Sequence, residues 1–289
     1  MMAKKKPIQT KGFTIKKETS KILKGIIETL ASIIDEAKFQ ITPSEFIVEA
    51  MDPSRICLLN LTIKKGDFDE YQCAEEVHIG LNLDDLDKIL KRSNANDSIE
   101  LSFEAYEQKI KVKMKRQGST RTRTFSLALL DVDIEEIPME NLLKIEYKTN
   151  WKMDTEFFVE AIKDAEIYSE ILNLKAIENE GLNFSSSGQI GEMNYELDID
   201  DLIESDIKDS ASGAYSLTFL KSILKISTIT EKLSIFLKSD HPLKMIFDLL
   251  EGGKLFYFLA PRVDSEAEYD DDDEEVWEET NEAIEEEAT

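Results

Sequence analysis

The stretch Leu83–Lys91 (LDDLDKILK) returns in type and spacing as Leu217–Lys225 (LTFLKSILK), 134 residues further along the chain. In both stretches apolar residues occupy the first, fourth, seventh and eighth positions, which is the spacing of one face of an amphipathic helix. A second apolar pattern, within Ile22–Leu30, has a counterpart within Phe157–Ala165 at nearly the same offset. Because the two matches share an offset, the sequence predicts two copies of one structural unit, each with two helices.

Short segments of alternating apolar and polar residues between these helices predict strands. They are Phe46–Val48, Ile56–Ile63, Ile99–Phe103, Lys109–Lys115, Thr124–Leu129, Leu233–Lys238 and Leu255–Leu259. No regular alternation of strand and helix is present, so we expect an α+β fold with antiparallel sheets and two helices in each of two similar domains.

Composition divides the chain further. We expect a flexible basic leader at residues 1–12, a first domain at 13–129, an acidic connector at 130–142, a second domain at 143–263 and a disordered tail at 264–289. The tail holds 15 acidic residues and no basic one, so it repels itself and buries little. Without the tail, 45 acidic and 35 basic residues leave a net charge of −10. A body of this sign should repel nucleic acid as a whole, so any contact with nucleic acid would have to come from basic residues gathered on one face.

Enzyme signatures are missing from the sequence. It contains no Gly-rich phosphate loop, no GxSxG motif and no HExxH zinc site, and its two histidines, His78 and His241, stand alone. We therefore expect no catalytic activity, no cofactor and no metal site. Cys57 and Cys73 form no CxxC pair, and neither a secretory signal nor an apolar run of roughly 20 residues is present. These features predict a soluble intracellular protein with free thiols.

Several strings resemble those of the proliferating cell nuclear antigen family. They are Ala50–Ser54 (AMDPS), Phe68–Cys73 (FDEYQC), Gly80–Leu83 (GLNL), Leu86–Lys91 (LDKILK), Phe184–Gly191 (FSSSGQIG) and Leu255–Val263 (LFYFLAPRV). The similarity runs in order over residues 13–263, and its ending resembles archaeal members. It implies a DNA sliding clamp, a trimeric ring with helices lining the hole and sheets outside. Such a ring raises polymerase processivity and docks replication and repair proteins.

The resemblance places the helices around double-stranded DNA, and the basic residues on them are candidates for phosphate contact. The candidates are Lys16, Lys21, Lys24, Lys88, Lys91, Arg92, Lys163, Lys221 and Lys225. Pairs spaced three or four residues apart share one side of a helix. Weak contacts to phosphates carry no base preference, which suits a ring that slides.

A hydrophobic docking pocket on the outer face is also implied by the resemblance. Its expected residues are Met51, Ile56, Leu58, Ile134, Ile137, Pro138, Pro242, Phe258, Ala260 and Pro261. Through clamp-binding peptide motifs it would receive DNA polymerase, the clamp loader, flap endonuclease and DNA ligase. This form of recognition uses a compact set of aromatic anchors.

Ring closure would use edge strands, because pairing removes an exposed edge. The expected interface residues are Thr124, Phe125, Leu127 and Leu129 in the first domain, and Leu182, Phe184 and Ser186 in the second. A homotrimer and a heterotrimer of related subunits both remain open. So do a checkpoint-like subunit active only in a heterotrimer and, from other classes, an acidic chaperone or a DNA-processing enzyme. An archaeal protein would be cytoplasmic and nucleoid-associated, and a eukaryotic one nuclear.

Overall fold

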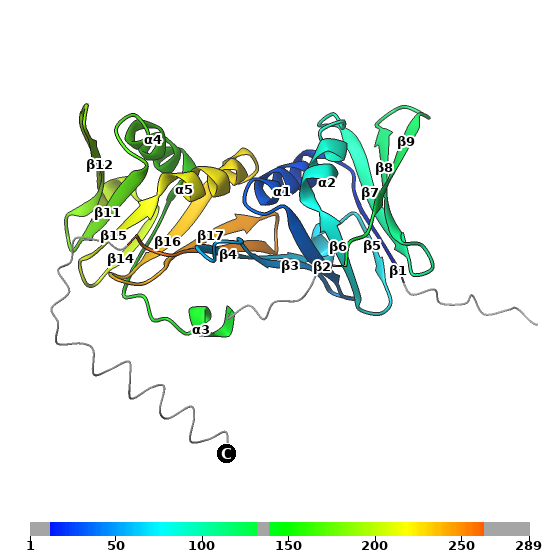
Figure 1. The fold of residues 1–289 in the computed structure, drawn as a ribbon, viewed down its shortest axis with the longest axis horizontal. Coiled ribbons are helices and arrows are strands. Elements are labelled where there is room, and N and C mark those ends of the chain that lie inside the picture. Colours follow the sequence, from blue (N-terminus) through cyan, green and yellow to red (C-terminus); the bar gives the residue numbers. More distant parts are fainter. Residues whose placement is uncertain (1–11, 132–138, 263–289) are drawn as a thin grey trace, which may run out of the picture.

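The computed structural model describes residues 12–131 and 139–262, which form two halves with the same order of elements (Figure 1). The first half contains β1 (Gly12–Lys17), α1 (Lys21–Ala31), β2 (Glu36–Ile41), β3 (Glu45–Met51), β4 (Cys57–Lys64), the 3₁₀ turn η1 (Lys65–Asp67), β5 (Glu70–Cys73), β6 (Val77–Asn82), α2 (Leu83–Leu90), β7 (Asp97–Glu104), β8 (Lys109–Arg116) and β9 (Thr122–Ala128).

The second half follows the short helix α3 (Met139–Leu143). It contains β10 (Thr149–Asp154), α4 (Thr155–Ala165), β11 (Ile171–Ile177), β12 (Gly181–Gly188), β13 (Gly191–Asp198), η2 (Ile199–Asp201), β14 (Glu204–Ile207), β15 (Ala211–Ser216), α5 (Leu217–Ile223), η3 (Leu224–Thr228), β16 (Lys232–Leu237), β17 (Leu243–Leu249) and β18 (Gly253–Leu259). The predicted duplication, with two main helices in each half among antiparallel strands, is confirmed.

Three antiparallel sheets carry the helices. A five-stranded sheet has the order β5-β1-β7-β8-β9, and a four-stranded sheet has the order β13-β12-β11-β15. The third sheet has nine strands in the order β14-β10-β16-β17-β18-β4-β3-β2-β6, so it contains strands of both halves. The halves join where β18 pairs with β4, with Leu259 opposite Cys57 and Lys254 opposite Thr62.

The four main helices lie together on one face of the nine-stranded sheet (Figure 1). Their apolar stripes supply core residues such as Ile26, Leu86, Phe158 and Leu220, all nearly inaccessible to solvent. Burying each of these side chains stabilises the fold by about 2 kcal/mol. The stripe in the sequence therefore decides which side of each helix faces the sheets, and the polar sides are left exposed together.

Local sequence explains where the helices begin and how closely they approach. Asn82 caps α2, because its side chain accepts a hydrogen bond from the Asp85 backbone N–H at 2.9 Å. Asp84 and Asp85 also place negative charge at the positive end of the helix dipole. In α1, a Cβ at Gly25 would lie 2.5 Å from Ile229 Cγ2, so glycine lets α1 pack against the second half.

The predicted free edges are only half right. β9 is an edge strand, since within the described residues it pairs only with β8. The prediction that Leu182–Ser187 forms the other edge is wrong, because β12 is paired on both sides, with β11 and with β13. Leu182, Phe184 and Ser186 are accordingly buried, and the edge strands of that sheet are β13 and β15.

Some predicted segments lie outside the described residues. These are the leader up to residue 11, the tail from residue 264 and most of the connector, while β1 already begins at Gly12. Of the helices that the structure describes, none has the length and apolarity needed to cross a bilayer.

Candidate nucleic-acid interface and docking surfaces

The predicted DNA-facing residues, apart from Lys16, lie on the helices or directly after them. Lys21 and Lys24 are on α1, Lys88 is on α2, and Lys91 and Arg92 follow α2 directly. Lys163 is on α4, Lys221 on α5 and Lys225 on η3. Since all four helices lie on one face of the nine-stranded sheet, these cations belong to one layer of the molecule (Figure 1).

Some of these lysines already have a carboxylate partner. Lys88 Nζ lies 2.9 Å from Asp85 Oδ1, and Lys91 Nζ lies 2.7 Å from Asp87 Oδ2. The hydrogen bonds from these carboxylates raise the pKa of both lysines, so both remain charged. Lys221 is paired with Glu166 across the gap between α5 and α4. To contact a phosphate, each of these amines has to leave its carboxylate.

Other cations of the helix layer are not held in this way. Within the described residues, Lys21, Lys24, Lys163 and Lys225 have no carboxylate within ion-pair distance. Lys21, Lys163 and Lys225 are exposed, and Lys24 is half-buried. These four amines can contact a phosphate without breaking an ion pair.

The helix layer is not strongly basic, because acidic residues accompany the lysines. On α4, Glu156, Glu160 and Asp164 are all exposed near Lys163. Any attraction of this layer to a phosphate backbone would therefore be local, and with few contacts it would be weak and only modestly dependent on salt. This arrangement suits a surface that passes along DNA better than one that holds a fixed position.

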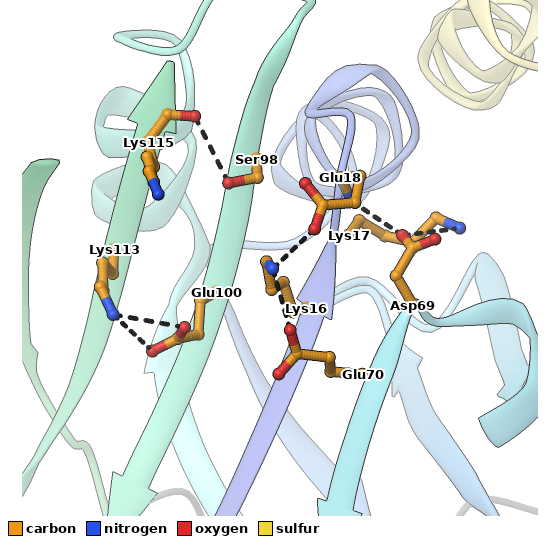
Figure 2. Close-up of polar contacts among 9 residues, drawn as sticks. All are labelled: Lys16, Lys17, Glu18, Asp69, Glu70, Ser98, Glu100, Lys113 and Lys115. Atoms are coloured by element: carbon orange, nitrogen blue, oxygen red, sulfur yellow. Dashed lines mark hydrogen bonds and ion pairs between the residues drawn. The ribbon is translucent and has the colours of Figure 1, made fainter. Parts of the chain in front are cut away.

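The placement of Lys16 contradicts its predicted role. Lys16 lies in β1, where Ile15 faces the core beneath the helices and Lys16 points to the opposite side of the sheet. Its amine is 2.6 Å from Glu18 and 2.9 Å from Glu70 (Figure 2). Those hydrogen bonds raise its pKa and hold it on the exposed face of the five-stranded sheet.

Three of the predicted docking residues, Met51, Leu58 and Phe258, lie on the face of the nine-stranded sheet opposite the helices. Leu58 of β4 and Phe258 of β18 are cross-strand neighbours, and both pack against Met139 of α3 in a small cluster separate from the main core. Met51 pairs with Leu58 from β3 and is half-buried, while Ile56 has an exposed fraction of 37%. Leu58 and Phe258 thus form an apolar floor, and Met51 and Ile56 offer accessible apolar surface beside it.

A second group of residues borders this apolar surface where the second half of the chain begins. The Tyr147 hydroxyl donates to the Pro242 carbonyl at 2.8 Å, and Lys244 Nζ lies 4.7 Å from the centroid of the Phe236 ring. Burial lowers the pKa of Lys244 and raises that of Tyr147 to about 12. Ala260 is fixed by a hydrogen bond from its N–H to the Ile56 carbonyl at 2.9 Å.

Not every predicted docking residue can be placed. Ile134, Ile137 and Pro138 lie outside the described residues. Pro261 lies two residues after the end of β18 at Leu259 and is half-buried. Met139, Tyr147 and Lys244 were missed by the sequence reasoning. Met139 adjoins the predicted connector and could have been found as an apolar residue there, whereas the ring contacts of Lys244 arise only from strand pairing.

The two edge strands have the same alternation. On β9, Phe125 and Leu127 are half-buried and turn toward the core side, while Thr124 and Ser126 are exposed. On β13, Met193 and Tyr195 are half-buried and pack against the main core, while Glu192, Asn194 and Glu196 are exposed. Each edge therefore offers unpaired backbone groups, a row of apolar side chains on the core face and a polar row on the outer face.

Within the described residues, no group of three or more His, Cys, Asp or Glu side chains is placed to hold a metal ion. Cys57 is buried and Cys73 is half-buried, and both are free thiols.

Comparison with known proteins gives consistent matches. The model for the proliferating cell nuclear antigen N-terminal domain matches residues 13–137, and the model for the C-terminal domain matches residues 141–262. A DNA polymerase sliding clamp of Thermofilum pendens is 35% identical over 244 residues, which cover 83% of this chain and 95% of the relative. A DNA polymerase sliding clamp of Thermococcus fumicolans is 31% identical over 264 residues, covering 87% and 99%. DNA polymerase sliding clamp 1 of Pyrobaculum aerophilum is 32% identical over 242 residues, covering 83% and 94%. The chain belongs to the proliferating cell nuclear antigen family.

Proposed function

We propose that this chain is the subunit of a DNA sliding clamp, a ring of three copies that encircles duplex DNA and tethers DNA polymerase to it. The archaeal relatives named DNA polymerase sliding clamp support this function over most of their length. The observation that carries the ring is the pairing of β4 with β18 inside the chain. By the duplication β4 corresponds to β13 and β18 to β9, and within the described residues β13 and β9 are both edge strands.

The equivalences follow from chain order and strand pairing. β4 and β13 have the same length, lie 134 residues apart and both run directly into a 3₁₀ turn. β18 and β9 are each the last strand of their half, paired on one side with the strand before. Since β4 pairs with β18 inside the chain, β13 of one copy is suited to pair with β9 of the next.

The duplication also predicts the register of that pairing. Phe125 ends the row Ile15–Leu101–Val112–Phe125, as Tyr257 ends the row Trp151–Ile235–Met245–Tyr257. Tyr257 pairs with Leu59, whose equivalent in β13 is Met193. The proposed ring therefore places Phe125 opposite Met193 of the partner subunit, with both side chains on the core face.

In this proposal the helix layer lines the hole and the sheets form the outside. An acidic body is compatible with DNA in the hole, since enclosure retains the duplex without tight binding. The accessible surface at Met51 and Ile56 would dock DNA polymerase, the clamp loader, flap endonuclease and DNA ligase through short peptide motifs with aromatic anchors. The chain itself would have no catalytic activity, and it would act where the chromosome lies, at the nucleoid of an archaeal cell.

Enclosure is tested by comparing retention on closed and open DNA. The protein is loaded by its clamp loader onto a nicked circular plasmid, unbound protein is removed by gel filtration, and half of the sample is then cut once. We expect the protein to stay with circular DNA and to be lost from linear DNA, because a ring slides off free ends. Equal retention on both forms would contradict the proposal, as would an absence of loading.

A specialised subunit that needs other chains is distinguished by light scattering on this chain alone. The trimer proposal predicts a particle of three 33.0 kDa chains, whereas an obligate heteromer would remain a monomer or dimer. Nuclease and histone-binding assays test the enzyme and chaperone alternatives, and we expect neither activity.

A further inference from the structure

We propose that Lys115 and Lys111 of β8 form ion pairs, across strand β9, with Glu196 and Glu192 of a second copy of this chain. The two free edges would then be complementary to each other in charge as well as in backbone pairing. The inference rests on the proposed ring of three copies, and it adds which charged side chains hold the subunits of that ring together.

The first half of the surface is a row of lysines on the exposed face of the five-stranded sheet. Ile110, Val112 and Met114 of β8 are buried, so the alternating residues between them point outward. The outward residues are Lys109, Lys111, Lys113 and Lys115. In a chain with a net charge of −25, four aligned lysines beside a free edge form a distinct positive strip.

Inside the chain these lysines are not all neutralised. Lys113 Nζ lies 3.4 Å from Glu100 of β7, and Lys111 Nζ lies 2.9 Å from Glu107 (Figure 2 shows the first pair). Lys115 has Ser98 opposite it on β7, and the Ser98 hydroxyl donates to the backbone carbonyl of Lys115 at 3.4 Å. Among the residues that the structure describes, no carboxylate lies within ion-pair distance of the Lys115 amine.

The edge strand beside this strip carries only small side chains on the same face. Thr122 pairs with Lys115, Thr124 with Lys113 and Ser126 with Lys111, and all three β9 residues are exposed. Such short side chains leave space above β9, so an extended lysine on β8 can reach over them toward the next strand.

The second half of the surface is the outer row of β13. Leu197 is buried and Met193 and Tyr195 turn to the core side, so Glu192, Asn194 and Glu196 point outward and are exposed. Glu196 Oε1 accepts a hydrogen bond from Asn194 Nδ2 at 2.8 Å. Among the described residues no lysine or arginine lies within ion-pair distance of Glu192 or Glu196.

The predicted register brings the two rows together in matching order. With Phe125 opposite Met193 of the partner subunit, Thr122 lies opposite Glu196 and Ser126 opposite Glu192. Lys115 and Glu196 of the partner subunit then stand two strand spacings apart, about 10 Å between backbones, which an extended lysine and glutamate on one face can span. Lys111 and Glu192 of the partner subunit are related in the same way.

No ion pair across the junction is expected in the middle row, whereas Lys111 would have to leave Glu107, its partner inside the chain, to reach the partner subunit. Lys113 is already paired with Glu100, and the residue that the register places across β9 from it is the neutral Asn194 of the partner subunit. Lys109 provides a contrast at the end of the strip. Lys109 pairs with Ala128, and the register places Ile190 of the partner subunit, which is not acidic, on the other side of Ala128.

These rows define a test with matched variants. We would prepare Lys115→Glu, Glu196→Lys, the double variant Lys115→Glu/Glu196→Lys, and the control Lys109→Glu. Sedimentation velocity over a dilution series at 50 mM and 500 mM NaCl gives the concentration at which half of the assembly has dissociated. All substitutions are at exposed positions, and circular dichroism melting confirms that each variant is folded.

Each single reversal is expected to raise that concentration about three- to tenfold at 50 mM NaCl, because an attractive pair becomes a repulsive one at every junction. The double variant should return to within about twofold of the parent, since each junction regains one opposite pair. Lys109→Glu should stay within about twofold as well. At 500 mM NaCl the differences should shrink, because exposed charges are screened.

The ion-pair proposal is overturned if Lys115→Glu has no more effect than Lys109→Glu, or if the double variant is as weak as the single ones. If the parent protein is a monomer at every concentration, or if Met193→Arg leaves its assembly intact, the proposed ring itself fails. If Met193→Arg dissociates the assembly and Lys115→Glu does not, the proposed ring stands and only the ion pairs are rejected.

Discussion

Arg123 of the edge strand β9 donates a hydrogen bond from Nη2 to Oδ2 of Asp97, the first residue of β7, at 2.9 Å. Asp97 is almost fully buried, and the Asn94 backbone N–H also donates to Oδ2 at 3.1 Å. Arg123 further donates from Nη1 to the Arg92 carbonyl at 3.0 Å. The strand proposed to bind the next subunit is thus fixed at one end by the loop that follows α2.

This anchor predicts a pH-dependent loss of stability in Arg123→Ala. Burial alone would raise the pKa of Asp97, but the Asn94 hydrogen bonds and the charges of Arg123 and Arg116 outweigh it, so the pKa falls below its ordinary value of 3.8. A lowered carboxyl pKa contributes stability above pH 3.8, and the contribution disappears as the pH falls through the lowered pKa. We expect Arg123→Ala to lower the free energy of unfolding by about 2 kcal/mol at pH 7 and by clearly less at pH 3. Urea unfolding at the two pH values measures the difference. The control is Arg121→Ala, at an exposed position just before β9, which should change stability little.

The helix layer predicts a difference between paired and unpaired lysines. We expect the triple variant Lys21→Ala/Lys163→Ala/Lys225→Ala to shorten the lifetime of the loaded protein on circular DNA by about fivefold or more, because these amines reach phosphates freely. The matched control is Lys88→Ala/Lys91→Ala/Lys221→Ala, which removes the same charge from amines already bound to carboxylates. Lifetimes are measured by fluorescence at fixed salt. Equal losses in the two triples would mean that net charge, and not individual contacts, retains the ring.

Periodicity predicted which segments are strands and helices, but it could not predict which strands are neighbours. Phe184 and Tyr195 both lie in segments of alternating apolar residues. Phe184 is buried only because its strand, β12, pairs with β11 on one side and with β13 on the other. The charges of Glu192 and Glu196 could have identified β13 as an edge strand, because charged side chains are common on the edge strands of sheets. Lys16 was misplaced for a related reason, because nearness to α1 in sequence does not decide on which side of the sheet a residue points.

The docking surface predicts that Ile56→Asp weakens peptide binding while the fold is kept. Ile56 is partly exposed beside the floor formed by Leu58 and Phe258, so a carboxylate there would meet the apolar side chains of a bound peptide. We expect the affinity for a peptide with a glutamine and two aromatic residues to fall at least about tenfold, measured by isothermal titration calorimetry. Ile167→Asp is the control, since Ile167 is also exposed but lies just after α4 on the helix side. Equal losses in both variants would contradict this placement of the pocket.

The edge of the second half predicts that Met193→Arg converts the assembly to monomers. Met193 is half-buried on the core face of β13, where the register places Phe125 of the partner subunit. A buried arginine without a partner there is strongly unfavourable. Light scattering should show the particle mass falling to one chain of 33.0 kDa. Ile203→Arg, at an exposed position just before β14, should leave the mass unchanged, and an unchanged mass in Met193→Arg would rule out β13 as the junction.

The pairing of β18 with β4 means that the proposed ring contains two kinds of seam. Inside each chain the strands meet at a local concentration that the chain itself fixes, on the order of millimolar or higher. At β9 and β13 the strands meet only at the concentration of the protein in solution. Dilution therefore separates subunits and leaves every β4–β18 seam closed. A loading machine that admits duplex DNA sideways has to open a β9–β13 seam, and the same seam sets how long the ring survives after loading.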